Sequence, residues 1–121
     1  MGEYPDPDMG TLRLRTLPNF WCHASSDHAV TTRLTPAGLR ETRVRVTWLV
    51  DASARPGMDY QFEKLLPFWK LTSEQDWENC ANVQRGVESP AYSPGPLSPT
   101  KEYNVASFLR WYVNYLGSPA E

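Results

Sequence analysis

Apolar and polar residues alternate in four consecutive runs through the first 50 residues of the chain. The runs occupy residues 11–17, 19–25, 29–34 and 41–50, and each places apolar side chains at every second position. A period of two is typical of a β-strand with one buried and one solvated face. Short connections, among them the turn sequence TPAG at 35–38, favour antiparallel pairing. The pattern therefore predicts a meander of about four antiparallel strands.

The spacing of apolar residues becomes helical further along the chain. The segment 57–66 has helical periodicity, and Pro67 is predicted to kink or end it because proline lacks a backbone donor. Thr72 followed by Gln75 forms a capping-box signature, in which two side chains satisfy backbone groups at the start of a helix. A second helix is therefore predicted to begin at Thr72 and to run to about Val87.

Four prolines between residues 90 and 99 separate this helix from the last one. They predict an extended surface loop, because proline fixes φ and cannot continue regular hydrogen bonding. Ser98 is the predicted N-cap of the last helix, with Pro99 in its first turn, and Gly117 is predicted to end it. The apolar positions of this helix recur at helical spacing: Val105, Phe108, Leu109, Tyr112 and Leu116.

Four strands followed by three helical segments predict an α+β fold. In this class we expect the helices to pack on one face of a curved antiparallel sheet. A four-stranded sheet with a long C-terminal helix resembles a partial helix-grip fold of the Bet v1-like type. Because proteins of that type hold apolar or amphiphilic ligands in a cavity, a non-catalytic module that binds a small ligand or a partner is one hypothesis for the function.

Composition narrows the function classes further. The chain has 121 residues, 40% of them hydrophobic, which is enough for one compact domain. A net charge of −2 and an isoelectric point near 5.7 provide no basic field for nucleic acid or an anionic membrane. No apolar stretch has the length of a transmembrane helix, and the acidic, proline-rich start does not resemble a signal peptide. The cytoplasm is the expected compartment.

Asp76 interrupts the apolar face of the predicted helix. At 3.6 residues per turn, Cys80, Val83 and Val87 form one narrow arc that includes Asp76. A carboxylate among apolar residues is costly to desolvate unless it is paired, hydrogen-bonded, protonated or bound to a metal. An ion pair with an arginine of the sheet, a place near the helix N-terminus, acid–base catalysis and metal ligation are the alternatives.

A series of short segments occurs in a specific order between residues 17 and 116. It includes LPNFWCHASSDHAV, TWLVDASARPGMDYQFEKLLPFW and the dense group QDW, VQRG, SPAY, GPLS and KEYNV. In this order the segments resemble the C-terminal part of the catalytic domain of Rieske non-haem iron oxygenase (ring-hydroxylating) alpha subunits. The similarity is closest to monooxygenases of glycine betaine and other quaternary ammonium compounds. It implies an N-terminal extension with a first short strand at 1–16 and a partial oxygenase catalytic domain at 17–121.

The resemblance implies a role for Asp76 as the carboxylate of an Fe(II) site formed with two histidines. Such a site leaves coordination positions open for oxygen and substrate. Trp69, Trp77 and Cys80 are then possible residues of the substrate pocket. Packing in a core is the simpler interpretation of aromatic residues at such positions.

The resemblance also implies that other functional parts lie upstream of this segment. In the family these parts are the two iron-ligand histidines and a Rieske domain, whose [2Fe–2S] cluster is held by two cysteines and two histidines. No [2Fe–2S] cluster is expected in this chain. The intact family oxidises small-molecule substrates, for example by oxidative N-demethylation. The chain is therefore expected to be inactive alone and to need a separately encoded Rieske-containing half, or else to form a homo-oligomer.

His23 and His28 are the remaining candidate metal ligands. Four residues separate them, as in the ligand pair of the family, but the surrounding pattern is that of a strand. Residues five apart on a strand project to opposite faces, so the two imidazoles converge only if the intervening SSD forms a turn. Structural histidines are the simpler interpretation. Cys22 and Cys80 belong to no metal-binding motif and are expected to be buried thiols.

Overall fold

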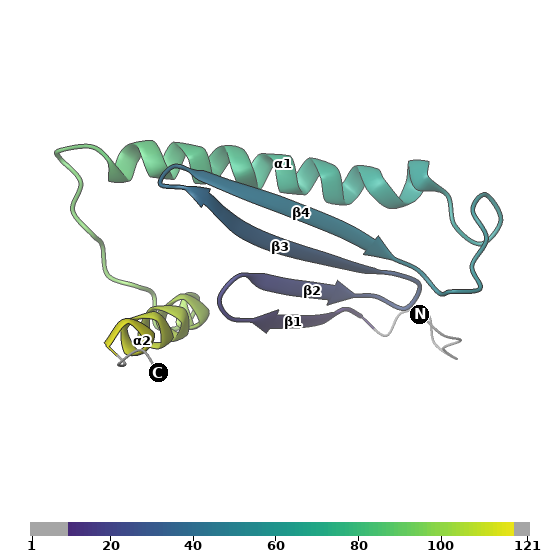
Figure 1. Ribbon diagram of the computed structural model, residues 1–121, viewed down its shortest axis with the longest axis horizontal. Coiled ribbons are helices and arrows are strands. Elements are labelled where there is room, and N and C mark those ends of the chain that lie inside the picture. The colour runs from purple at the N-terminus through teal and green to yellow at the C-terminus, as the bar shows by residue number, and fades with distance from the viewer. Residues whose placement is uncertain (1–9, 118–121) are drawn as a thin grey trace. The chain divides into compact units, whose positions relative to one another are not determined.

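The protein, described over residues 10–117 by a computed structural model, contains four strands followed by two helices (Figure 1). The elements are β1 (Leu12–Thr16), β2 (Phe20–Ala24), β3 (Ala29–Gly38), β4 (Glu41–Leu49), α1 (Phe62–Val87) and α2 (Tyr103–Gly117). They fall into two compact units, Met1–Ala54 with the sheet and Arg55–Glu121 with the helices. The predicted α+β class with four antiparallel strands is confirmed, and the elements are those of a helix-grip-like fold.

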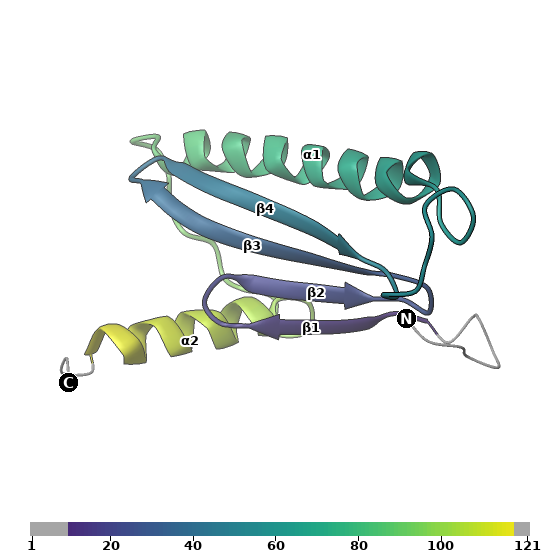
Figure 2. The same ribbon diagram turned by 45° about the vertical axis from the view of Figure 1, so that its right-hand side comes forward.

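The four strands form one antiparallel sheet in the order β1-β2-β3-β4, which Figure 2 shows from a second side. Direct partners across the sheet run from Arg13 through His23 and Val30 to Trp48. Ala29 and Val30 at the start of β3 are buried. The meander predicted from the alternating pattern is therefore confirmed.

The register assigns the residues of the sheet to two faces, because cross-strand partners point to the same side. One face, which we call the Trp48 face, contains Arg13, Arg15, Trp21, His23, Val30, Thr32, Leu34, Val44, Val46 and Trp48. The other, which we call the Phe20 face, includes Leu12, Leu14, Phe20, Cys22, Ala24, Arg33, Arg43 and Arg45. The two outer strands thus present their aliphatic rows on opposite faces. The prediction of one apolar and one solvated face is wrong in this respect.

β3 extends through the segment that the sequence predicts to be a turn. Pro36 pairs with Thr42, the register shifts just after Pro36, and the chain reverses at Leu39 and Arg40. A bulge at the end of a strand tolerates proline, because the missing backbone donor is not needed there. The predicted turn at 35–38 is therefore placed too early.

α1 is one continuous helix across Pro67, where the sequence predicts a kink or an end. Both ribbon views show it without interruption (Figures 1 and 2). Pro67 lies close to the start of the helix, where the first four backbone N–H groups have no helical partner, and it removes one further bond, to Glu63. The apolar positions before Pro67 stay in phase with those after it, which favours one helix over two.

Thr72 lies inside α1 and does not cap a helix. Its hydroxyl donates to the carbonyl oxygens of Phe68 (2.9 Å) and Trp69 (3.3 Å), one turn earlier in the helix. The helix begins after Gln61 instead, whose carbonyl accepts the N–H of Leu65 at 3.0 Å. The capping-box start at Thr72 is therefore wrong, because a threonine can satisfy its hydroxyl within a helix as well as at its start.

α2 begins at Tyr103, later than the predicted cap at Ser98. The Ser98 hydroxyl accepts the N–H of Lys101 at 3.3 Å, and the Glu102 carboxylate accepts the N–H of Ser98 at 2.6 Å. This reciprocal pair resembles a capping box, but it encloses a turn that precedes the helix. α2 extends to Gly117, which is the last described residue. Within residues 10–117, neither helix combines the length and apolar character that a membrane span requires.

Candidate functional site

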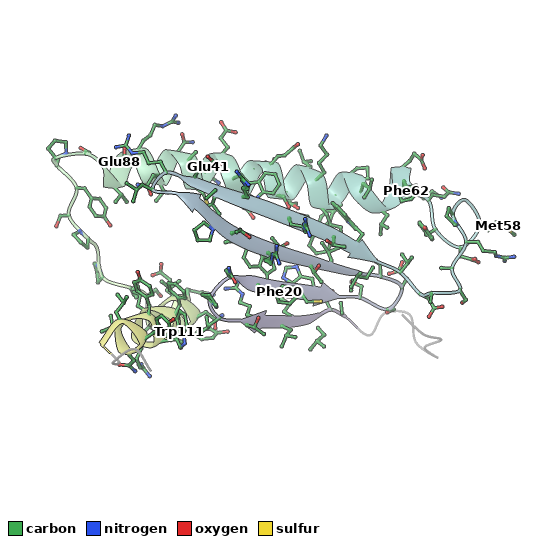
Figure 3. The ribbon with its side chains drawn as sticks, in the orientation of Figure 1. Phe20, Glu41, Met58, Phe62, Glu88 and Trp111 are labelled. Carbon is green, nitrogen blue, oxygen red and sulfur yellow. The ribbon has the colours of Figure 1, made fainter. Side chains whose placement is uncertain are left out.

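The continuous helix α1 carries one apolar stripe along its whole length, with Asp76 in the middle. At about 100° per residue, the stripe comprises Phe62, Leu65, Trp69, Thr72, Asp76, Cys80, Val83 and Val87. Trp69 lies two turns before Asp76 and Cys80 lies one turn after it, a rise of about 10 Å and 6 Å respectively. Trp77 is rotated by about a quarter turn from the stripe. Figure 3 shows the side chains of α1, with Phe62 near its start and Glu88 just after its end.

Most charged residues of α1 lie outside this stripe, and some polar side chains interact with one another. The ammonium group of Lys70 lies 3.8 Å from the Glu74 carboxylate, and the Gln84 amide donates to Glu88 at 3.1 Å. These i, i+4 pairs are typical of a solvated helix face. The polar side thus accounts for the other charged residues of this region, whereas Asp76 belongs to the apolar side.

The position of Asp76 within α1 excludes one interpretation of this acid. The favourable interaction between an acid and the helix dipole is confined to the first turn, which in α1 contains Glu63. Asp76 lies about four turns further along. Within residues 55–117, the described part of the unit that contains α1, the Asp76 carboxylate forms no hydrogen bond or ion pair. Neither helix capping nor a salt bridge within residues 55–117 therefore explains why an acid occupies this position.

The residues of the candidate pocket differ in their exposure. Asp76 and Cys80 are exposed, Trp77 is 44% exposed and Trp69 is half-buried. Val83 and Val87, further along the stripe, are 65% and 42% exposed. The expected burial of the two cysteines is not observed, because Cys80 is exposed and Cys22 only half-buried.

The described residues include one carboxylate that is a candidate ligand for iron. A carboxylate is a suitable oxygen ligand for Fe(II), and the Asp76 carboxylate has no competing partner within residues 55–117. No cluster of three or more histidine, cysteine, aspartate or glutamate side chains occurs in this part of the chain. Asp76 fits one ligand position, and a complete site needs further donors.

His23 and His28 belong to different local structures. His23 lies on β2 and on the Trp48 face, opposite Arg13. His28 lies in the connection to β3, where its carbonyl accepts the N–H of Ser25 at 2.8 Å and its Nδ1 lies 2.7 Å from the Asp27 carboxylate. The hydrogen bond to His28 holds the pKa of the Asp27 carboxyl below its usual value. These contacts are typical of structural histidines.

The Trp48 face places two arginines close to His23. Burial, together with the charges of Arg13 and Arg15, lowers the pKa of the His23 imidazole. The sequence alone did not place the two arginines beside His23. Alternation assigns the residues of one strand to its two faces, but it does not show which residues of neighbouring strands share a face. The cross-strand pair Arg13 and His23 defines it in the structure.

Replacing Arg13 by glutamine is expected to raise the pKa of His23 toward its ordinary value near 6.5. In the unmodified chain, His23 binds a proton at a higher pH in the unfolded state than in the folded state. The sheet therefore loses stability as pH falls below 6.5. Arg13→Gln is expected to reduce that loss. NMR titration of the imidazole measures the pKa. Arg43→Gln, on the other face of the sheet, is the control and leaves it unchanged. An unchanged pKa in Arg13→Gln contradicts the placement of Arg13 beside His23.

Comparisons with known proteins connect this arrangement with one family. The family "Ring hydroxylating alpha subunit (catalytic domain)" matches residues 1–118 of the chain. The glycine betaine monooxygenase oxygenase subunit of Chromohalobacter salexigens is 46% identical over 112 residues, which are 93% of this chain and 25% of the relative. The corresponding subunit of Pseudomonas aeruginosa is 40% identical over 97% of this chain and 28% of its own length. The chloroplastic choline monooxygenase of Atriplex hortensis is 28% identical over 78% of this chain and 21% of its own length.

The matches cover only part of each relative. The chain spans about a quarter of the length of the two bacterial relatives.

Proposed function

Because the chain belongs to the family of ring-hydroxylating alpha subunits, with its catalytic-domain signature over residues 1–118, we propose that it supplies the C-terminal part of the catalytic domain of a Rieske-type non-haem iron monooxygenase. The proposed reaction of the assembled protein is the oxidative removal of an N-methyl group from a quaternary ammonium substrate. The bacterial relatives support this substrate class, since both are glycine betaine monooxygenase oxygenase subunits. The cytoplasm is the proposed compartment.

We propose that Asp76 provides the carboxylate ligand for Fe(II) in the assembled subunit. The observation that carries this role is its place in the middle of the apolar stripe of α1, far from the first turn and with no hydrogen bond or ion pair of its carboxylate within residues 55–117. When bound, Fe(II) supplies a centre for oxygen chemistry. The task of α1 is to hold the Asp76 carboxylate on a rigid helix at a fixed phase relative to Trp69 and Cys80.

The neighbours of Asp76 are suited to the wall of a substrate pocket. Trp69 and Cys80 share its stripe, and Trp77 lies beside it. An indole face attracts a quaternary ammonium group through its quadrupole, which fits the proposed substrate class. We assign no ligand role to His23 or His28, because His23 lies opposite the cationic Arg13 in the sheet and His28 is hydrogen-bonded to Asp27. The histidine ligands and the [2Fe–2S] cluster are proposed to come from outside residues 1–121.

Turnover is expected only after the chain is combined with the remainder of an alpha subunit. We call this remainder the complementary part, defined as the sequence of the Chromohalobacter salexigens relative outside its matched quarter. The chain mixed with the complementary part and a reductase is expected to release formaldehyde from glycine betaine in the presence of oxygen. The chain and reductase without the complementary part are the control. Formaldehyde release in this control, or its absence from the complete mixture, contradicts the proposal.

A ligand-binding module is the alternative function, and the aromatic side chains of α2 favour it. Phe108 stacks on Tyr112 with ring centroids 5.9 Å apart, and Trp111 stacks on Tyr115 at 5.5 Å. Tyr112 and Tyr115 are 45% and 67% exposed, so a flat aromatic surface is accessible on this helix. Stacked, accessible rings of this kind are suited to apolar or cationic ligands. A chain that dimerises without iron and binds such ligands would support the module.

A further inference from the structure

The hairpin of β1 and β2 presents an exposed apolar surface on the Phe20 face. Leu14 pairs with Cys22 and Leu12 pairs with Ala24, so these side chains lie side by side, and Phe20 continues the row on β2 (Figure 3). Leu12 is 70% exposed and Leu14 is 52% exposed. We call this set the hairpin surface. Two leucines at successive outward positions of one strand form a contiguous patch, which is typical of an interaction site.

The outer edge of β1 adjoins the hairpin surface. Within residues 10–117, β1 pairs with β2 on one side and with no strand on the other. An edge strand presents alternating N–H and C=O groups that can pair with another strand. The apolar face and the edge together indicate a partner that contributes a strand to the sheet and covers Leu12 and Leu14.

The charges of β1 restrict the chemistry of that strand. Arg13 and Arg15 alternate with the leucines and point to the Trp48 face. Opposite charges favour a cross-strand pair and like charges disfavour it. A fitting strand therefore has apolar residues on the side of Leu14 and acidic residues on the side of the arginines.

A second copy of the chain does not meet this requirement. Antiparallel pairing of β1 with itself about a two-fold axis centred on Leu14 places Arg13 of one copy opposite Arg15 of the other. Shifting the centre to either arginine places that arginine opposite itself. Centring the axis on Leu12 or Thr16 instead pairs Arg13 with Thr11 or Arg15 with Leu17, so no arrangement centred within β1 places an acidic residue opposite either arginine.

We propose that the hairpin surface and the outer edge of β1 dock a strand of the complementary part, in which apolar residues alternate with acidic ones. The relatives are about four times as long as the segment that this chain matches, so they contain a large amount of sequence from which such a strand can come. The identity of this occupant rests on the proposed function. The docking itself requires neither iron nor turnover.

Binding of the chain to the purified complementary part tests the interface without iron. Isothermal titration calorimetry measures Kd, and Leu14→Asp is expected to weaken binding about 100-fold, because it places a charge in a buried contact. Leu14→Thr retains strand propensity and is expected to weaken binding by about tenfold. The matched control is Leu39→Asp at the β3–β4 turn, where the leucine is also exposed but lies away from the hairpin, and it leaves Kd unchanged.

Charge reversal provides the second arm of the test. Arg13→Glu is expected to weaken binding about tenfold, with Arg43→Glu on β4 as its control. Circular dichroism and NMR spectra verify that each variant is folded, and Leu14→Thr retains the test if Leu14→Asp does not fold.

Three outcomes overturn the proposal: no binding by the unmodified chain, an equal loss in Leu14→Thr and Leu39→Asp, or a dimer of this chain that Leu14→Thr dissociates. Binding that shows the expected losses in a mixture without turnover supports the interface and counts against the proposed function.

Discussion

Replacement of Asp76 by alanine in the assembled subunit is expected to reduce oxygen-dependent demethylation by at least about 100-fold. The carboxylate is the one metal ligand that we assign to this chain, and a site with two remaining ligands holds iron weakly and in an undefined geometry. Formaldehyde release under saturating glycine betaine and oxygen measures the effect. Calorimetric binding of the chain to the complementary part is expected to stay unchanged, because Asp76 is not part of the hairpin surface.

Glu74→Ala is the matched control for Asp76→Ala. Glu74 lies on the same helix but on its polar side, where its exposed ion pair with Lys70 is worth no more than about 1 kcal/mol. Turnover in Glu74→Ala is expected to stay within about twofold of the unmodified chain. An equal loss in the two variants indicates damage to the helix and contradicts a specific role of the Asp76 carboxylate.

Replacement of Pro67 by alanine is expected to stabilise α1 by up to about 3 kcal/mol. Pro67 lies inside a continuous helix, so alanine restores the N–H that donates to the carbonyl of Glu63 and relieves the contact of the proline ring with that turn. Urea unfolding followed by circular dichroism at 222 nm measures the change in the free energy of unfolding. If two separate helices met at Pro67, alanine would restore no helical hydrogen bond and this gain in stability would not occur.

Gly86→Ala provides the control for Pro67→Ala. Gly86 lies in the last turn of α1, and a Cβ atom placed there has no other atom within 4 Å. Alanine therefore stabilises the helix through propensity alone, by at most about 1 kcal/mol. A gain in Pro67→Ala no larger than that in Gly86→Ala contradicts a continuous helix across residue 67.

The sheet illustrates which features of the fold are local in the sequence. Each strand was predictable because side-chain alternation along a strand depends only on its own residues. The face shared by two strands depends on register, which the pairing of Leu14 with Cys22 and of Val30 with Trp48 sets. For this reason the opposite placement of the aliphatic rows of β1 and β4 could not be predicted from the alternating pattern.

The helices show a competition between local signals and a longer pattern. Pro67 and Thr72 are local signals for a helix boundary, yet the stripe from Phe62 to Val87 keeps one phase through both of them. The hydrogen bond lost at Pro67 costs less than dividing the apolar stripe between two helices. The stripe therefore determines the extent of α1. At Ser98 the capping signal was correct in its contacts, but it stabilises a turn before α2.

Of the candidate site, only the placement of its residues around one helix could be predicted from the sequence. The spacing of Asp76, Cys80 and Val83 placed the acid on the apolar side, and the helix confirms that arc and extends it to Trp69. The complete set of metal donors could not be predicted from this pattern, because ligands converge through tertiary contacts. No cluster of three such donors occurs among the described residues.

Iron analysis of the assembled subunit is the most direct test of the role of Asp76. The chain bound to the complementary part, loaded with Fe(II) under anaerobic conditions and desalted, is expected to retain about one iron per assembled subunit beyond the iron of the [2Fe–2S] cluster. The complex with Asp76→Ala is expected to retain less than about a tenth of that amount, while the Glu74→Ala complex matches the unmodified one. Full retention of iron by the Asp76→Ala complex would show that this carboxylate is not a ligand.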